Sequence, residues 1–264
     1  MVDVHCHLNF HAFEKDSDKV IKGAFKDGVE KIINVGTKID SSEKALDLAE
    51  KYENLYAIVG VHPHHANKVQ KNWIDDLERL ARNPKVVAIG ECGLDYYEYK
   101  SNGIVDPKIQ KEVFIKQIEL SSKLKLPLQI HNRLAGKDIT EILKSYKNEL
   151  LNPPGMFHCF SGGIEHLKQV LELGFYVGFD GNITYKGIAK GEEASLSELV
   201  AFAPIDRIVT ETDAPFLTPE PHRGERNLPS YVIIVGRSIA KIKGLPKDFV
   251  RRETVKNANS LFNL

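Results

Sequence analysis

Residues 86–91 have the sequence VVAIGE, and residues 126–131 have the sequence LPLQIH. Each is a short apolar run that ends in a residue able to bind a metal ion or move a proton. Between them, residues 106–125 place apolar side chains three and four positions apart with charges on the other face, which is the pattern of an amphipathic helix. Two strands joined by a helix pair in parallel, so this unit predicts an α/β protein built on a parallel sheet.

The same alternation covers the whole chain. We expect strands over residues 2–5, 31–35, 55–61, 86–89, 126–130, 155–160, 174–179 and 207–210. We expect helices over residues 17–27, 41–52, 72–82, 106–125, 136–150, 164–173 and 192–202, followed by 231–242 and 247–262. Eight such units in 264 residues favour a closed barrel. An open doubly wound sheet is the alternative, but no glycine-rich phosphate loop follows the first strand.

No linker, internal repeat or change in composition divides the sequence. We therefore predict one domain over residues 1–264, a (β/α)8 TIM-type barrel with an additional C-terminal helix. The composition, 42% hydrophobic and 27% charged, is that of a chain able to bury a full core.

Charge and cysteine content exclude several classes of protein. The 36 basic and 36 acidic side chains give zero net charge, which argues against a large basic face that coats nucleic acid, although a local patch remains open. The odd number of cysteines, 3, argues against a secreted disulfide framework. No apolar run approaches the roughly 20 residues of a membrane span, and no signal peptide precedes the first strand. We expect a cytoplasmic protein without membrane association or an obligate protein partner.

Potential metal ligands gather where the predicted strands end. They are His5, His7, Glu91, His131, His158 and a carboxylate within residues 210–213. His5 and His7 lie two apart on a strand, so both imidazoles are expected to point into the barrel and Cys6 toward the helices. Cys92 and Cys159 also follow proposed ligands by one position and are expected to be small core residues.

So many ionisable groups buried together would cost several kcal/mol each without compensation, and metal ions are the natural compensation. Six ligands exceed what one zinc ion needs, so we expect two divalent cations per chain, with Glu91 able to bridge them. The histidines favour softer ions, but this preference alone does not decide among Mg²⁺, Mn²⁺ and Zn²⁺.

The order and wording of these motifs resemble the TatD-like deoxyribonuclease family of the amidohydrolase superfamily. The matching stretches are DVHCHL at 3–8, GVHPH at 60–64, GECGLDY at 90–96, IHNR at 130–133, FHCFSG at 157–162, ETDAPFL at 211–217 and NANSLF at 257–262. The resemblance therefore runs from the first strand to the last helix.

The resemblance implies metal-dependent hydrolysis of phosphodiester bonds, commonly by a nuclease on DNA. One ion would be held by His5, His7, Glu91 and Asp213, and the other by Glu91, His131 and His158. Asp213 would also act as the general base. Many two-metal amidohydrolases have a modified lysine at the position of Glu91. The nuclease-like branch has a glutamate there, as this chain does. We predict a deoxyribonuclease with exonuclease action on DNA that is single-stranded or frayed at its end.

Phosphate requires cationic or N–H partners around the barrel mouth. The expected substrate contacts are His62, His64, Arg133, Arg223 and Arg226, with Lys186 as a further cation. Tyr96, Tyr97 and Tyr99 either stack on unpaired bases or pack a loop over the rim. The chain departs from the family at Glu225, where a basic residue is usual, and at Leu228, where an acid is usual. These changes concern the grip on substrate and not the metal site.

Two other functions use the same residues. A hydrolase of a small amide, ester or phosphoester would need the same two-metal site, so the ligands cannot separate it from a nuclease. A metal-binding protein without catalysis is disfavoured because no ligand is missing from the set.

Overall fold

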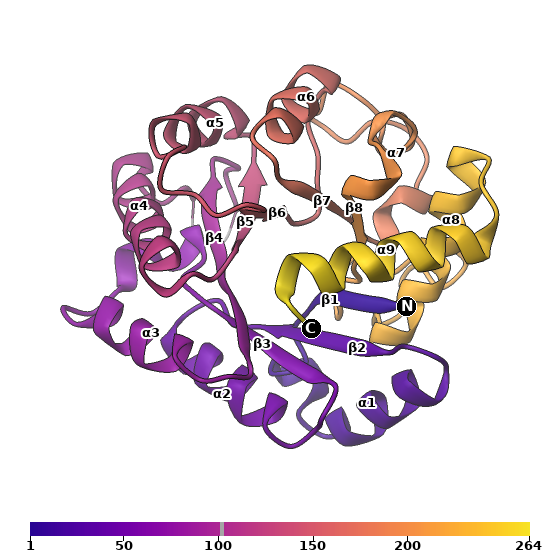
Figure 1. Ribbon diagram of the computed structural model, residues 1–264, viewed down its shortest axis with the longest axis horizontal. Helices are drawn as coiled ribbons and strands as arrows, with labels where there is room; N and C mark the ends of the chain where they lie inside the picture. Colours follow the sequence, from indigo (N-terminus) through magenta and orange to yellow (C-terminus); the bar gives the residue numbers. More distant parts are fainter. Residues whose placement is uncertain (101–102) are drawn as a thin grey trace.

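The computed structural model describes residues 1–100 and 103–264. Its sheet has eight strands, all parallel and in sequence order from β1 to β8 (Figure 1). They are β1 Val2–Cys6, β2 Lys31–Val35, β3 Leu55–Val59, β4 Val86–Asp95, β5 Leu128–Arg133, β6 Gly155–Phe157, β7 Tyr176–Phe179 and β8 Ile208–Thr210. The predicted (β/α)8 barrel is confirmed.

Helices lie outside the strands and form a ring around them (Figure 1). They are α1 Ser17–Lys26, α2 Ile39–Ala49, α3 Trp73–Ala81, α4 Pro107–Leu124, α5 Gly136–Ser145, α6 Ile164–Glu172, α7 Leu196–Phe202, α8 Val232–Lys243 and α9 Lys247–Phe262. The start of α7 was predicted four residues too early. It begins after Ser195, whose side chain accepts a hydrogen bond from the Glu198 backbone N–H while Glu198 bonds back to Ser195.

Strand β4 is longer than predicted, because it continues through Gly90 to Asp95 instead of ending at Ile89. Its second half pairs with β5, with Gly93 opposite His131 and Asp95 opposite Arg133. The close approach explains Gly93, since a Cβ there would lie 2.0 Å from the His131 carbonyl oxygen. Glu91 and Asp95 are therefore held on one rigid strand.

The barrel closes between β1 and β8 through a short contact. Cys6 and Ala214 form an isolated parallel bridge, and the His7 N–H donates to the Ala214 carbonyl over 2.7 Å. The buried Asp3 carboxylate accepts from the Thr212 N–H at 2.9 Å and the Thr212 hydroxyl at 2.7 Å. This closure brings the loop after β8 next to the histidines of β1.

Two apolar cores stabilise the fold, one between the sheet and the helices and one inside the barrel. The inner core joins strand residues to the last turns of α9, namely Val2, Val4, Ile33, Val35, Ile58, Val87, Ala88, Met156, Tyr176 and Val209 with Ala258, Leu261 and Phe262. Helix α9 crosses in front of the barrel in Figure 1. The additional C-terminal helix therefore plugs the end of the barrel where the strands begin.

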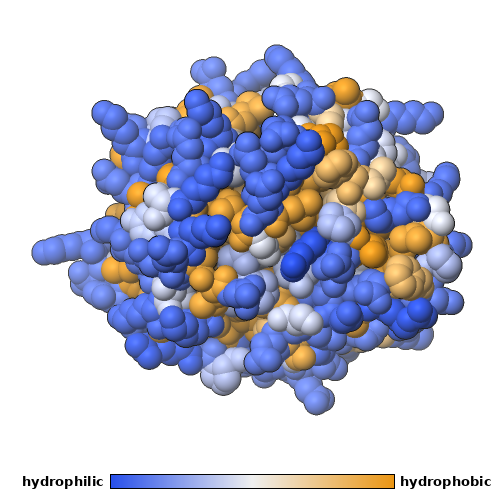
Figure 2. Space-filling model, turned by 45° about the horizontal axis from the view of Figure 1, so that its top comes forward, coloured by the Kyte–Doolittle hydropathy of each residue, from blue (hydrophilic) through white to orange (hydrophobic). Residues whose placement is uncertain are grey.

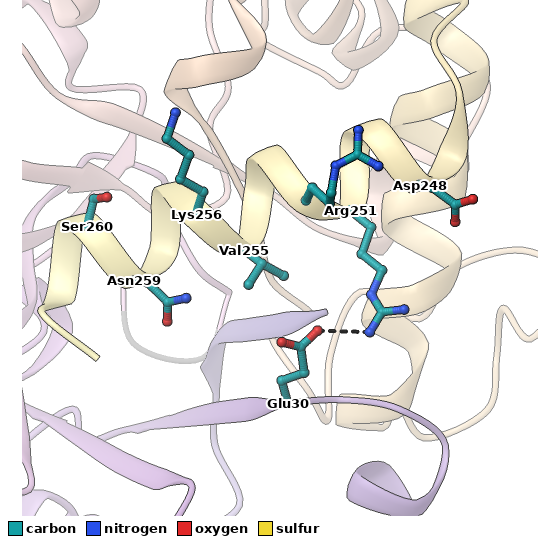
Figure 3. Close-up of a pocket in the computed structure, with 8 residues that line it drawn as sticks. Glu30, Asp248, Arg251, Val255, Lys256, Asn259 and Ser260 are labelled. Atoms are coloured by element: carbon teal, nitrogen blue, oxygen red, sulfur yellow. Dashed lines mark hydrogen bonds and ion pairs between the residues drawn. The ribbon is translucent and has the colours of Figure 1, made fainter.

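Polar contacts fasten α9 across this end. Arg251 pairs with Glu30 at 3.0 Å (Figure 3). The Lys31 ammonium donates to the Asn259 side chain over 2.9 Å. The pocket drawn in Figure 3 lies between Glu30 and residues of α9, at the end of the barrel opposite to the carboxyl ends of the strands. The face in Figure 2 is mostly hydrophilic, with apolar side chains between the charged ones. Across the described residues, every helix is too short or too polar to cross a bilayer.

Candidate active site

All six predicted metal ligands meet at the carboxyl ends of the strands. His5 lies on β1 and His7 just beyond it, Glu91 lies on β4 and His131 on β5, and His158 and Asp213 follow β6 and β8. Five of them, all except His5, line one cavity of about 760 Å³. This is the end of the barrel where enzymes of this fold keep their chemistry.

His5, His7 and Asp213 form a first group of possible ligands, and Glu91 lies beside its two histidines. Nε2 of His5 lies 3.1 Å from Nε2 of His7, and these two atoms lie 3.6 and 3.4 Å from Oδ1 of Asp213. Oε2 of Glu91 lies 3.7 and 3.8 Å from the same two nitrogens. Ligands about 2.1 Å from a tetrahedral ion are about 3.4 Å apart, so the spacing of His5, His7 and Asp213 fits one divalent cation, with Glu91 close to the two histidines.

The other carboxylate oxygen of Glu91 faces a second group. Oε1 lies 2.8 Å from Nδ1 of His131 and 3.7 Å from Nε2 of His158. Glu91 thus presents one oxygen to each group, which is the arrangement that a bridging ligand requires. Burial alone would raise the pKa of Glu91, but the surrounding histidines, His62 and His131 foremost, hold it well below the usual range.

Several ligands are oriented from behind by hydrogen-bond partners. Nδ1 of His7 lies 2.9 Å from the Val35 carbonyl, and Nε2 of His131 lies 3.1 Å from Oδ2 of Asp95. Nδ1 of His158 lies 3.2 Å from Oε2 of Glu211. Metal-binding histidines almost always donate their second ring N–H to a carboxylate or carbonyl. Asp95 is placed to accept from His131 in this way, and Glu211 lies at ion-pair distance behind His158.

Sequence reasoning did not assign Asp95 or Glu211, although both lie inside the quoted motifs. A usable indication existed for Asp95: it follows Glu91 by four positions, so on a strand it shares the face of Glu91. Glu211 and Asp213 compete for one role in the sequence. Only the fold shows that Glu211 lies behind His158 while Asp213 lies beside His5 and His7.

The buried histidines differ in their proton affinity. Burial lowers the pKa of His131, but the hydrogen bonds to Asp95 and Glu91 outweigh it and raise the value to about 9. His158 is likewise raised to about 10 by Glu211, against the effect of burial. Burial, together with the charge of His158, lowers the pKa of His5 well below its usual value. The carboxylates thus favour positive charge in the second group of ligands.

His62 and His64 lie beside the second group and line the same cavity. Nε2 of His62 is 3.5 Å from Oε1 of Glu91, and Nε2 of His64 is 3.0 Å from Oδ2 of Asp95. His62, Asp95 and His131 also form a cluster with the spacing of metal ligands. Both histidines therefore lie close to Glu91 and to the second group of ligands.

The three arginines expected at the mouth have different surroundings. Arg133 and Arg223 line the cavity, as does Lys186. Arg223 lies 4.0 Å from the centre of the Tyr185 ring. The guanidinium of Arg226 instead forms two hydrogen bonds to Asp16, of 2.9 and 2.7 Å, and so ties its loop to the start of α1.

The two departures from the family pattern lie outside the residues that line the cavity. The carboxylate of Glu225 is exposed and lies 3.2 Å from His222. The half-buried Leu228 packs against the core between the sheet and the helices.

The tyrosines after Glu91 are largely engaged by protein groups. Arg133 lies 4.0 Å from the centre of the Tyr97 ring and donates to the Tyr99 hydroxyl over 2.7 Å. The Tyr99 hydroxyl donates to Asp95, and the Tyr96 hydroxyl donates to Asp138 over 2.7 Å. Of the two hypotheses for these residues, the structure favours packing of the loop over the rim.

The prediction for the cysteines holds for two of them. Cys6 and Cys92 are fully buried in the core between sheet and helices. The prediction for Cys159 was wrong, because this residue lines the cavity and its Sγ accepts from the Asn182 side chain over 3.3 Å. Strand β6 ends at Phe157, and the backbone of Cys159 is left-handed with φ of 44°, so strand alternation no longer applies.

Comparison with known proteins agrees with this geometry. A sequence profile of the family described as TatD related DNase matches residues 2–263. The uncharacterized metal-dependent hydrolase YabD of Bacillus subtilis is 39% identical over 265 residues, which cover 100% of this chain and 99% of the relative. The 3′-5′ ssDNA/RNA exonuclease TatD of Erwinia tasmaniensis is 36% identical over 269 residues and covers 100% of both chains.

A solved structure supports the same assignment. The TatD homolog YjjV from Escherichia coli has a TM-score of 0.90 and 28% sequence identity, and the match covers 100% of this chain and 98% of that one. The resemblance found in the sequence motifs is thereby confirmed. The chain belongs to the TatD related DNase family of metal-dependent hydrolases.

Proposed function

We propose that this protein is a deoxyribonuclease that uses two divalent cations, Mg²⁺, Mn²⁺ or Zn²⁺, to remove nucleotides from the end of a DNA strand. The observation that carries the proposal is the placement of Glu91, whose two oxygens face separate groups of ligands. Two divalent cations held by these residues would supply activation of a water molecule and stabilisation of charge on the oxygens of a phosphodiester.

The residues of the chain have distinct roles in this proposal. Glu91 and the four histidines of the two groups, His5, His7, His131 and His158, would hold the cations together with Asp213. Oδ1 of Asp213 lies at the cavity side of the first group, where it can accept a proton from the attacking water. His62 and His64 lie where they can hydrogen-bond to a phosphate oxygen.

A nucleic acid substrate is supported by the lining of the cavity and by the relatives. Arg133, Lys186 and Arg223 provide local positive charge in a chain of zero net charge. A relative 36% identical over its whole length is named as a single-stranded DNA and RNA exonuclease. Arg226, held by Asp16, supports the loop that carries Arg223 and is not needed as a direct contact.

The test is product analysis with end-labelled single-stranded and duplex DNA. Each cation is added separately to chelator-stripped protein, and Glu91→Ala purified in parallel controls for contaminating nuclease. We expect shortening from one end that depends on the cation and is absent from the variant. No cleavage with any cation, although two bind per chain, would refute the nuclease and favour a hydrolase of a small amide, ester or phosphoester.

A further inference from the structure

Two phenylalanines border the cavity next to the first group of ligands. Phe216, in the loop after β8, is 51% exposed, and Phe10, in the loop after β1, is half-buried. Both line the cavity that contains the metal ligands. Apolar side chains that adjoin one another at the edge of a binding cavity commonly mark a place of contact with a ligand or partner.

The two rings are positioned by the metal site itself. Phe10 is stacked on the imidazole of His7, with ring centres 4.3 Å apart and planes at 11°. Phe216 packs with its ring 6.3 Å from that of Phe10 and at 72° to it. One short stack of rings therefore connects a metal ligand to an exposed aromatic side chain.

The backbone that carries Phe216 is held firmly. Its N–H donates to the Asp213 carbonyl over 2.8 Å, so the aromatic ring and the ligand belong to one tight turn. The Asn227 side chain donates to the carbonyls of Phe216 and Thr212 over 2.6 and 2.7 Å. A rigid, exposed aromatic ring at a fixed place beside the reacting atoms can bind a flat partner at little entropic cost.

We propose that Phe216, supported by Phe10, is the platform on which an unpaired base stacks while the adjacent phosphodiester lies at the metal centre. This inference rests on the proposed function and specifies its substrate, a strand end whose base is free of its complement. The occupant follows from the surroundings: the ring borders the ligands on one side, and Arg223 and Lys186 supply positive charge in the same cavity. The tyrosines of the β4 loop are already engaged by Arg133, Asp95 and Asp138.

The experiment compares two single-stranded oligonucleotides that differ only at the attacked end. One carries normal bases, and the other carries abasic residues, so both present the same phosphodiesters. For Phe216→Ala, we expect the preference for the normal substrate, measured as the ratio of kcat/KM values, to fall roughly 5- to 150-fold, with the change mainly in KM. Phe216→Tyr should restore the preference.

Phe202→Ala is the matched control, because Phe202 is 47% exposed at the end of α7 and outside the cavity. This variant should keep the wild-type preference. A Phe216→Ala enzyme with an unchanged ratio, whether both substrates are cleaved normally or both equally poorly, would overturn the platform. Absence of cleavage by the wild-type protein itself would instead overturn the nuclease proposal, and the platform with it.

Discussion

Asp95→Asn should weaken the binding of one cation and spare the other. Oδ2 of Asp95 accepts from the Tyr99 hydroxyl at 3.1 Å and lies 3.1 and 3.0 Å from the ring nitrogens of His131 and His64. Oδ1 accepts the Tyr97 backbone N–H over 2.9 Å. An asparagine has the same shape as aspartate, but an NH₂ group must replace either Oδ1 or Oδ2. Whichever way the amide is turned, a donor then faces a donor in a buried site.

The size of the effect follows from the role of His131. Loss of a carboxylate behind a metal-binding histidine typically reduces metal affinity about 10- to 100-fold, or roughly 1.4–2.7 kcal/mol. Asp95 contacts only the second group of ligands, through His131, while the first group has its own support from the Val35 carbonyl. We therefore expect one of the two binding steps to weaken and the other to stay unchanged.

Calorimetric titration of chelator-stripped protein with Mn²⁺ or Zn²⁺ measures both steps. Glu98→Gln is the matched control, because Glu98 is an exposed acid three residues after Asp95, in the loop that follows β4. Wild-type affinity for both cations in Asp95→Asn would refute the role assigned to Asp95. An equal loss at both steps would refute the division of the centre into two groups that meet at Glu91.

Three further predictions concern the centre, the plug and the mouth. Glu91→Gln should lose both cations, seen as metal content by mass spectrometry, with at least about 10²-fold lower activity and unchanged circular dichroism. Phe262→Ala should lower the free energy of unfolding in urea by about 3–5 kcal/mol, because the ring is buried in the inner core. Arg226→Ala should lower the free energy of unfolding by at most about 1 kcal/mol, because it removes the partly exposed pair with Asp16, and should leave KM for DNA nearly unchanged. Arg223→Ala should raise KM, because Arg223 lines the cavity. The reverse order of KM values would contradict the placement of these arginines.

The sequence predicted the barrel because each strand carries its own local pattern. Short β-branched runs alternate with helical periods, and eight such units allow few other architectures. The second half of β4 was not predicted, because Gly90 and Gly93 have low strand propensity. This segment is a strand in the structure because it pairs with β5. Pairing between strands is not a property of either segment alone, so local patterns could not supply it.

The gathering of the six proposed ligands was predictable for a related reason, whereas the residues behind them were not. His5 and His7 follow from strand alternation, and the ends of parallel strands meet at one mouth whatever the loops do. Asp95 and Glu211 act on histidines from other strands, so their roles depend on which side chain faces which across the barrel. Arg226 illustrates the same limit: its partner Asp16 is 210 positions away in the sequence.

The two ends of the barrel differ in what their side chains contribute to folding. At the mouth, buried carboxylates and histidines share a small volume, and gathering them costs free energy unless a cation is bound. At the other end, Leu261 and Phe262 of α9 are buried against apolar residues of β1 and β2. The free energy gained by burying these apolar side chains therefore helps to offset the free energy lost by gathering charged groups at the mouth, because the same strands carry both. It follows that removal of bound cations should leave the barrel folded but loosen the mouth first, with hydrogen exchange rising in residues after β1 and β8 while α9 stays protected. Simultaneous loss of protection at both ends on chelation would show that the cations, and not the plug, hold the barrel together.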